Sequence, residues 1–210
     1  MSDPPSDNYL SPYVEAQQEF GSDFKVTLWA NERTQKLRFK VFTEMLFMTG
    51  KRVLDAGCSR GDMAQYLLEH EMPYGRFIGV DGLPEVIDYA NGRGLRDAEF
   101  HAGDFVTDPS LLKIGDPQVI AISGTLNTME GDMAIELLEA AWASASESLI
   151  FNFLSDTVSP SAPRQKPPAL RLPTLRILAW AMERTPCVCL RQDYFSYGHD
   201  ATILMRRVVV

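Results

Sequence analysis

The chain has 210 residues, of which 45% are hydrophobic and 23% are charged, and these fractions are typical of a folded globular protein. Twenty basic residues against 28 acidic ones give a net charge of -8, which argues against a protein whose main task is to bind a phosphate backbone. The three cysteines cannot form a disulfide framework, and no cysteine or histidine spacing resembles a zinc site. We therefore expect a cytoplasmic protein with no bound metal and no nucleic-acid partner.

Residues 1–30 are expected to form an amino-terminal tail and lid segment. The opening residues, MSDPPSDNYLSP, lack the basic start and the apolar core of a signal peptide. No apolar run of about 18 residues occurs anywhere, so no membrane span or membrane partner is expected. The prolines and aspartates favour a solvated tail, in which Tyr9 and Tyr13 are the groups that pack. Together with Trp29 they are either aromatic lid residues or ordinary packing residues.

Short apolar runs and helical patterns alternate from residue 31 onward. Helices are predicted over 31–49, 63–71, 84–90 and 133–145. The signals are apolar residues at helical spacing and prolines that bound a helix. Runs too short for helices predict strands over 52–56, 77–80, 98–102, 119–122 and 148–154. This alternation indicates βαβ units and therefore an α/β fold, with a doubly wound, mostly parallel sheet and helices on both faces.

The end of the chain has a different pattern. Residues 157–173 carry five prolines and are expected to form a loop or lid, followed by an amphipathic helix that begins at 169 or 173 and ends at 184. Two β-rich stretches, 187–195 and 201–210, predict an antiparallel hairpin with its turn at 196–200. The prediction is a seven-stranded sheet in one domain over 31–210, with a proline-rich insert and helix at 157–185.

The segment VLDAGCSRGDMA predicts a ligand-binding turn between the first strand and its helix. Glycines at 57 and 61 allow backbone N–H groups to approach a ligand closely. No Gly-Lys-Ser/Thr follows, as it would in a P-loop, and the spacing differs from the G-x-G-x-x-G of dinucleotide binders. The carboxylate of Asp55 would repel a pyrophosphate but suits an amino group or a positive charge.

Two further acids follow the next two strands. Asp81 ends the run Ile78-Gly79-Val80, at the position that receives ribose hydroxyls in doubly wound folds. Asp104 and Phe105 follow the third strand, where a carboxylate and an aromatic face suit an adenine ring. Taken alone, Asp81 could equally be a charge that stabilises a helix N-terminus rather than a ribose ligand. Asp104 alone could be a turn residue rather than an adenine contact.

The motifs VLDAGCSRG, IGVD and AGDF, with the terminal hairpin, resemble a class I S-adenosylmethionine-dependent methyltransferase over roughly residues 33–207. The resemblance implies S-adenosylmethionine as the cofactor, with Asp55 and Gly57 at its methionine moiety, Asp81 at the ribose, and Asp104 with Phe105 at the adenine. The cofactor-binding residues that it implies are Gln35, Arg38, Asp55, Gly57, Cys58, Gly61, Asp81, Gly82, Asp104, Phe105 and Ser123.

Two details of this resemblance concern single residues. Gln35-Lys36-Leu37-Arg38-Phe39 resembles a Q-x-x-R-F helix of small bacterial members, in which Arg38 would pair with the cofactor carboxylate. Ser59 stands where the family's G-x-G-x-G motif has its middle glycine. A serine fits that place if the backbone there is not left-handed.

The methyl acceptor is harder to predict, because the donor is already activated and the protein mainly positions a nucleophile. The stretch Ser123–Asn127 lacks the Pro-Pro tetrad of enzymes that methylate base amino groups, which favours an O or N atom of a small-molecule metabolite. Asn127 is either a helix N-cap or a substrate contact. At the hairpin tip, Tyr197, His199 and Asp200 form either an exposed polar turn or, through His199, a proton acceptor.

The insert offers one electrostatic contrast. Residues 157–185 contain five Lys or Arg residues and one Glu, so they form either a basic lid that attracts an anionic substrate or a solvated helix face. Two other function classes stay open. One is a different enzyme on this scaffold, such as an aminopropyl transferase or a nucleotide-dependent oxidoreductase, and the other is a non-catalytic cofactor-binding sensor or interaction protein.

Overall fold

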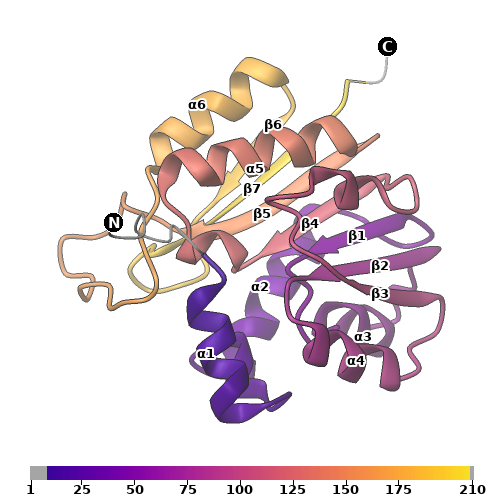
Figure 1. The fold of residues 1–210 in the computed structure, drawn as a ribbon. Coiled ribbons are helices and arrows are strands. Elements are labelled where there is room, and N and C mark those ends of the chain that lie inside the picture. The colour runs from indigo at the N-terminus through magenta and orange to yellow at the C-terminus, as the bar shows by residue number, and fades with distance from the viewer. Residues whose placement is uncertain (1–8, 209–210) are drawn as a thin grey trace, which may run out of the picture.

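A computed structural model describes residues 9–208 and shows a mixed sheet flanked by helices (Figure 1). The strands of the described residues lie in the order β3-β2-β1-β4-β5-β7-β6, and β7 alone runs in the opposite direction to the other six. Their bounds are β1 Arg52–Ala56, β2 Arg76–Asp81, β3 Ala98–Ala102, β4 Val119–Ser123, β5 Ser148–Leu154, β6 Val188–Arg191 and β7 Asp200–Arg206. The predicted fold class is confirmed, including the antiparallel end of the sheet.

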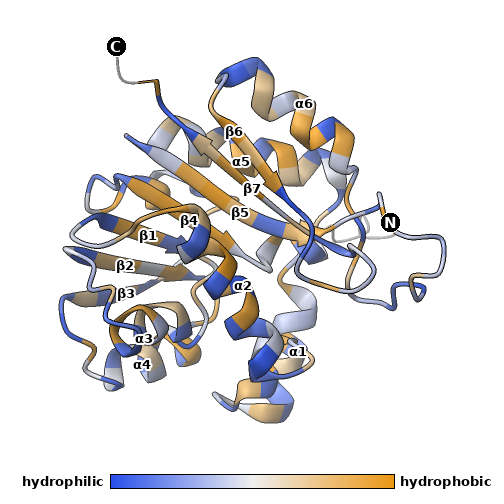
Figure 2. Cartoon of the chain, turned by 180° about the vertical axis from the view of Figure 1, so that it is seen from behind, coloured by the Kyte–Doolittle hydropathy of each residue, from blue (hydrophilic) through white to orange (hydrophobic). Residues whose placement is uncertain are grey.

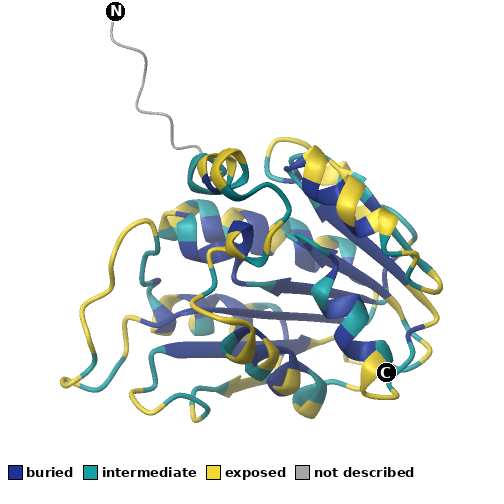
Figure 3. Ribbon diagram, turned by 90° about the horizontal axis from the view of Figure 1, so that it is seen from below, coloured by how far each residue is buried: buried dark blue, intermediate teal, exposed yellow. Residues whose placement is uncertain are grey.

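Helices cover both faces of this sheet. The α-helices are α1 Ser11–Phe20, α2 Glu32–Met45, α3 Asp62–Glu69, α4 Pro84–Gly92, α5 Gly131–Ser144 and α6 Thr174–Arg184. Short 3-10 turns are η1 Phe24–Thr27, η2 Pro109–Lys113 and η3 Thr125–Thr128. One buried cluster joins α5 and α6 to the sheet and a second joins α2, α3 and α4, so the sheet is the middle layer, as its dark strands show in Figure 3.

The central strands are apolar on both faces because both faces are covered. Every residue of β5 is buried, and Figure 2 shows the central strands largely in the orange of hydrophobic residues, interrupted by a few hydrophilic segments. One polar side chain, Asn152, lies fully buried within β5. A buried amide needs hydrogen-bond partners, and those partners belong to the site described below.

Two parts of the sequence-based account are corrected by the structure. The last two residues of the predicted solvated tail, Ser11 and Pro12, begin α1 instead, because Pro12 is tolerated in the first turn of a helix and Tyr9 and Ala16 are buried. Residues 1–8, the rest of the predicted tail, lie outside the described residues. The hairpin is also offset, since β6 ends at Arg191 and β7 begins at Asp200. The predicted domain boundary at residue 30 stays a prediction.

No helix within residues 9–208 is long and apolar enough to cross a membrane.

Candidate functional site

A pocket lies where the loops after β1, β2 and β4 meet, beneath the amino-terminal segment. Its volume is about 970 Å³ when its open mouth is included. The carboxyl ends of parallel strands are the place where doubly wound folds bind ligands. The predicted site residues that line it are Gln35, Asp55, Gly57, Cys58, Asp81, Gly82, Phe105 and Ser123.

The glycine loop is held tightly between β2 and η3. Gly57 has a φ of 84°, and a Cβ atom at that position would overlap the side chain of Thr125, so a glycine is required there. The backbone N–H groups of Gly57 and Cys58 both donate to the carbonyl oxygen of Val80, at 2.8 and 3.2 Å. The predicted strand-turn-helix is therefore present, although Gly61 does not itself line the pocket.

Ser59 adopts the left-handed backbone conformation, with a φ of 45°. A serine was expected to fit only if the backbone were not left-handed, so this expectation is not met. A residue with a Cβ atom pays about 1–2 kcal/mol for this conformation. The conformation directs the Ser59 N–H to the carboxylate of Asp81, at 2.9 Å from Oδ2. A backbone hydrogen bond to a carboxylate offsets part of this strain.

Asp81 ends β2 with its carboxylate in the pocket wall. Its Oδ1 accepts from the N–H of Leu83 at 3.1 Å, and its Oδ2 accepts from Ser59. Burial raises the pKa of Asp81 to about 6, although these N–H donors act in the opposite direction. The carboxylate is therefore oriented by the backbone, which leaves its remaining lone pairs for a ligand.

Asp55 is a buried carboxylate without a cation beside it. It is 3% exposed, and its Oδ1 has no hydrogen-bond partner among the described residues. Burial, followed by the nearby charges of Asp81 and Asp62, raises the pKa of Asp55 to about 8. An unpartnered buried acid of this kind is satisfied by a ligand that carries a positive charge and N–H donors.

A third acid, Asp62, lines the pocket at the start of α3. Its Oδ1 forms a salt bridge with Arg93 at 2.8 Å, and its Oδ2 accepts from the side chain of Gln35 at 3.4 Å. Gln35 is buried in α2 and lines the same pocket. This contact joins α2 to the glycine loop region.

The amino-terminal segment covers the β2–β3 side of the pocket. The hydroxyl of Tyr9 donates to Oδ1 of Asp104 at 2.7 Å, and its ring lies 6.4 Å from that of Phe105. Burial raises the pKa of Tyr9, which keeps its hydroxyl protonated as the donor. Leu10 packs against Gly82, where a Cβ atom would be too close to it. Asp104 does not line the pocket, whereas Phe105 does.

Arg38 does not line the pocket but belongs to a buried polar network. Its guanidinium pairs with Asp200 and lies between the rings of Trp29 and Phe195, at 4.2 and 4.7 Å from their centres. Asp200 is fully buried at the start of β7, so the expectation of an exposed turn at this residue is wrong. Because the guanidinium is committed to Asp200, we do not include Arg38 among the proposed cofactor contacts.

Asn152 links this network to the pocket. Its Nδ2 donates to Oδ1 of Asp200 at 3.1 Å, and its Oδ1 accepts from the N–H of Gly124 at 2.9 Å. Trp29 lies directly against Gly124, where a Cβ atom would overlap its ring. The buried amide of β5 therefore holds the loop after β4 in place.

The loop after β4 presents neutral polar groups. Ser123 Oγ is buried without a partner among the described residues. Asn127 lies in η3, where its Oδ1 accepts from the N–H of Leu154 and its carbonyl oxygen accepts from the N–H of Leu170. The N-cap interpretation is wrong, since α5 begins four residues later. Asn127 instead ties the proline-rich loop to the sheet.

The other two catalytic candidates lie away from the pocket. Tyr197 is 41% exposed, and His199 is half-buried with its ring 4.7 Å from that of Phe195. Burial lowers the pKa of His199, so its ring is neutral at neutral pH. Of the three candidates, Asn127 alone lines the pocket.

Several lining residues were not predicted. They come from the amino-terminal segment, the start of α3, the loop after β2, η3 and the proline-rich loop: Leu10, Val26, Thr27, Leu28, Asp62, Leu83, Thr128, Pro168 and Ala169. Asp62 could have been found as an acid at the start of the helix that follows the glycine loop. The others are brought to the site by tertiary packing, for which the local sequence carries no signal.

Comparisons with known proteins agree with this geometry. Residues 48–140 match the profile of a family described as a methyltransferase domain. No curated protein sequence gives a significant match. Among solved structures, magnesium protoporphyrin IX methyltransferase from Synechocystis, with bound S-adenosylhomocysteine, is 14% identical with a TM-score of 0.66, covering 96% of this chain and 97% of that one.

Two further structures show the same fold. Phosphoethanolamine N-methyltransferase 1 from Haemonchus contortus is 13% identical with a TM-score of 0.68, and the match covers 97% of this chain but 49% of that one. A methyltransferase from Archaeoglobus fulgidus that depends on S-adenosylmethionine is 14% identical with a TM-score of 0.61, covering 93% and 99%. At this level of sequence identity, the matches show that the chain shares the fold of these enzymes.

Proposed function

We propose that the chain is a class I S-adenosylmethionine-dependent methyltransferase and that it transfers a methyl group to an oxygen or nitrogen atom of a small molecule. Its cofactor is S-adenosylmethionine. The observation that carries the proposal is the pocket, in which the carboxyl ends of β1 and β2 supply the carboxylates of Asp55 and Asp81 and the end of β4 with the loop after it supplies neutral groups.

The first part of the proposal assigns the cofactor contacts. Asp55 fits the positively charged amino group of the cofactor, because it is a buried acid with an oxygen that has no partner among the described residues. Asp81 fits the two ribose hydroxyls, since Ser59 and Leu83 fix its orientation. Phe105 supplies a buried aromatic wall for the adenine. Gly57 and Cys58 bring the backbone close to the bound molecule.

When bound, the cofactor would supply a methyl group that is already activated by its bond to a positively charged sulfur, and that sulfur would keep the electrons of the bond that breaks. The residues of this chain then act mainly by holding the acceptor in line with the donor and by excluding water. Trp29, the loop after β4 and the proline-rich loop enclose the side of the pocket that is left for the acceptor. A proton released by the acceptor passes to water.

A small molecule is supported by the way the pocket is covered. Tyr9, Leu10 and Tyr13 of the amino-terminal segment line it, and so do Pro168 and Ala169 of the proline-rich loop. A macromolecule would have to present a single protruding group to reach between these segments. Two of the similar structures carry names of enzymes that act on small molecules, magnesium protoporphyrin IX and phosphoethanolamine.

The test uses S-adenosylmethionine carrying an isotopic label in its methyl group. The protein is incubated with this cofactor and a cell extract that has been split by ultrafiltration into small molecules and macromolecules. We expect protein-dependent label in the small-molecule fraction and its loss in Asp81→Ala. Label confined to the RNA or protein of the macromolecular fraction, or no transfer to either fraction, would contradict the proposal.

A further inference from the structure

The pocket has two ends that differ in charge. The strand order places β1 between β2 and β4, so the pocket extends along the sheet edge from Asp81 to Ser123. The proposed cofactor site takes up the β1–β2 end. The β4 end, which we call the acceptor end, is formed by Thr27, Leu28, Trp29, Gly124, Asn127, Thr128, Pro168 and Ala169.

The acceptor end is uncharged and the cofactor end is acidic. The charged residues that line the whole pocket within residues 9–208 are three aspartates: Asp55, Asp62 and Asp81. The acceptor end combines the ring of Trp29 and the side chains of Leu28 and Pro168 with hydroxyl and amide groups. Such a surface binds the apolar part of a ligand and forms hydrogen bonds with the few polar groups that the ligand carries.

The sequence suggested that the basic residues of the insert form a lid, but none of them lines the pocket and three of them bind other protein groups. Arg171 donates to the carbonyl oxygens of Ser155 and Pro163, at 2.8 and 3.1 Å. Arg176 pairs with Asp132, and Arg184 pairs with Glu139, both at 2.6 Å. These guanidinium groups are therefore used to fix the loop and α6 to the body of the protein.

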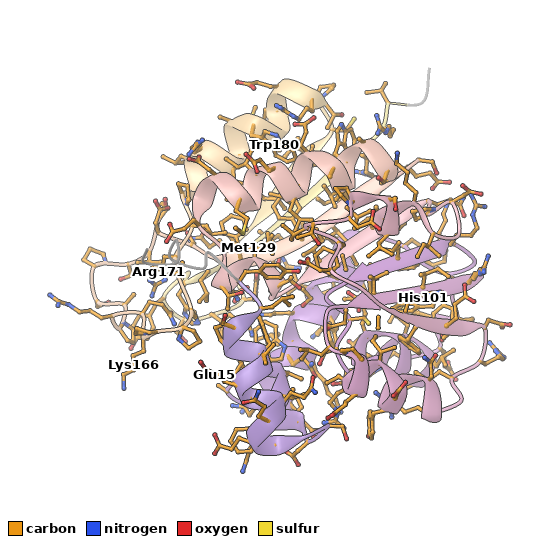
Figure 4. The ribbon with its side chains drawn as sticks, in the orientation of Figure 1. Glu15, His101, Met129, Lys166, Arg171 and Trp180 are labelled. Carbon is orange, nitrogen blue, oxygen red and sulfur yellow. The ribbon has the colours of Figure 1, made fainter. Side chains whose placement is uncertain are left out.

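The remaining bases do not reach the acceptor end either. Arg164 and Lys166 are exposed, and Figure 4 shows Lys166 on the outer part of the proline-rich loop, pointing away from the sheet. Arg38 contacts the ring of Trp29 but does not line the pocket, and its charge is already neutralised by Asp200. An anionic group bound at the acceptor end would lose its hydration, and no basic side chain among the lining residues would offset that cost.

From this arrangement we infer that the methyl acceptor is an uncharged or cationic molecule with an apolar body and carries no anionic group apart from the reacting atom. The inference rests on the proposed function, because it assigns the β1–β2 end to the cofactor. It replaces the anionic substrate that the composition of the insert suggested.

The test uses three probes that share a para-hydroxyphenyl ring and differ in the charge of their side chain: tyramine, tyrosol and para-hydroxyphenylacetate. Each is titrated into protein saturated with S-adenosylhomocysteine, at neutral pH. We expect the cation and the neutral probe to bind at least about tenfold more tightly than the anion. Tighter binding of the anion, or no binding of any probe, overturns the inference.

A variant that adds a positive charge at the acceptor end should shift the charge preference toward the anionic probe. Thr128→Lys is expected to raise the affinity for the anion relative to that for the neutral probe about tenfold. Ser144→Lys, at the end of α5 outside the pocket, adds the same charge and should leave this ratio unchanged. An equal effect of the two lysines would contradict the inference.

Failure of this inference is distinguishable from failure of the proposed function. If S-adenosylhomocysteine itself does not bind, the assignment of the cofactor end is wrong. If it binds and the anionic probe is preferred, the cofactor assignment stands and the inference about the acceptor is wrong.

Discussion

Arg38 of α2 and Asp200 of β7 form an ion pair although they lie 162 positions apart in the chain, and their side chains are 6% and 0% exposed. The pair fastens a helix on one face of the sheet to the antiparallel end of the sheet. Asn152 and the hydroxyl of Tyr194, which donates to Asp200 at 2.6 Å, complete the hydrogen bonds of the carboxylate.

Replacing one member of this pair is expected to be costly. Arg38→Met should lower the free energy of unfolding by about 3–5 kcal/mol, because it leaves the carboxylate of Asp200 buried without its countercharge. Urea denaturation measures this change. The double variant Arg38→Met with Asp200→Asn should recover at least part of the loss, since it removes the buried charge as well.

The same helix provides a matched control. Lys40 pairs with Glu44 at 3.6 Å on the surface, with 62% and 42% of the two side chains exposed. Lys40→Met should change the free energy of unfolding by less than about 1 kcal/mol, because exposed pairs contribute little. If the Arg38 and Lys40 variants were equally stable, the buried network would not have the structural role assigned to it.

The glycine loop gives a prediction of opposite sign. Ser59→Gly should stabilise the protein by about 1 kcal/mol, because glycine adopts the left-handed conformation without a Cβ penalty and keeps the N–H that donates to Asp81. The gain is reduced by the greater freedom of glycine in the unfolded chain. A thermal melt that shows a clear decrease in melting temperature would argue against strain at this position.

The sheet could be predicted largely because its signals are local. Apolar runs bounded by glycine and charged residues gave β1, β3 and β5 with their observed bounds. Asp55 in β1 and Asp81 at the end of β2 were also predicted to lie at the site, since the ends of parallel strands meet at one edge of a sheet. These features depend on short stretches of sequence and on the general geometry of the fold.

The parts that were missed depend on contacts between distant segments. Arg38 was expected to bind a cofactor carboxylate, but it pairs with Asp200, and nothing in either local sequence indicates this partner. The bases of the insert suggested a basic lid for the same reason, because composition does not show that Arg176 faces Asp132. The sequence shows where charged residues lie along the chain, but the partner of each charged side chain is determined by tertiary packing.

The raised pKa of Asp55 predicts how stability depends on pH. Its pKa is about 8 in the folded protein and about 3.9 in an unfolded chain, so the folded state binds the proton more tightly. The stabilisation is present below pH of about 4 and is lost as pH rises toward about 8, at up to about 1.4 kcal/mol per pH unit.

Asp55→Asn removes this titration. Without ligand, the variant should be more stable than the parent protein at pH of about 8, and its free energy of unfolding should vary less with pH above about 4. Urea denaturation across this range provides the measurement. Parallel pH profiles for the two proteins would show that Asp55 titrates normally.

Tyr9 is expected to hold the amino-terminal segment over the pocket. Tyr9→Phe removes the bond to Asp104, and hydrogen bonds to charged groups contribute about 1.5–3 kcal/mol. Amide hydrogen exchange in α1 should therefore become faster. Tyr89→Phe, at an exposed tyrosine whose hydroxyl accepts from Arg60, is the matched control and should leave exchange in α1 unchanged.

The assignment of the cofactor site is tested most directly by calorimetric titration of S-adenosylhomocysteine into the parent protein, Asp81→Ala and Asp88→Ala, an exposed aspartate of α4 outside the pocket. We expect a micromolar dissociation constant, about -8 kcal/mol, for the parent and for Asp88→Ala, and binding at least about tenfold weaker for Asp81→Ala. Equal affinity of all three proteins, or no binding by the parent, would contradict this assignment.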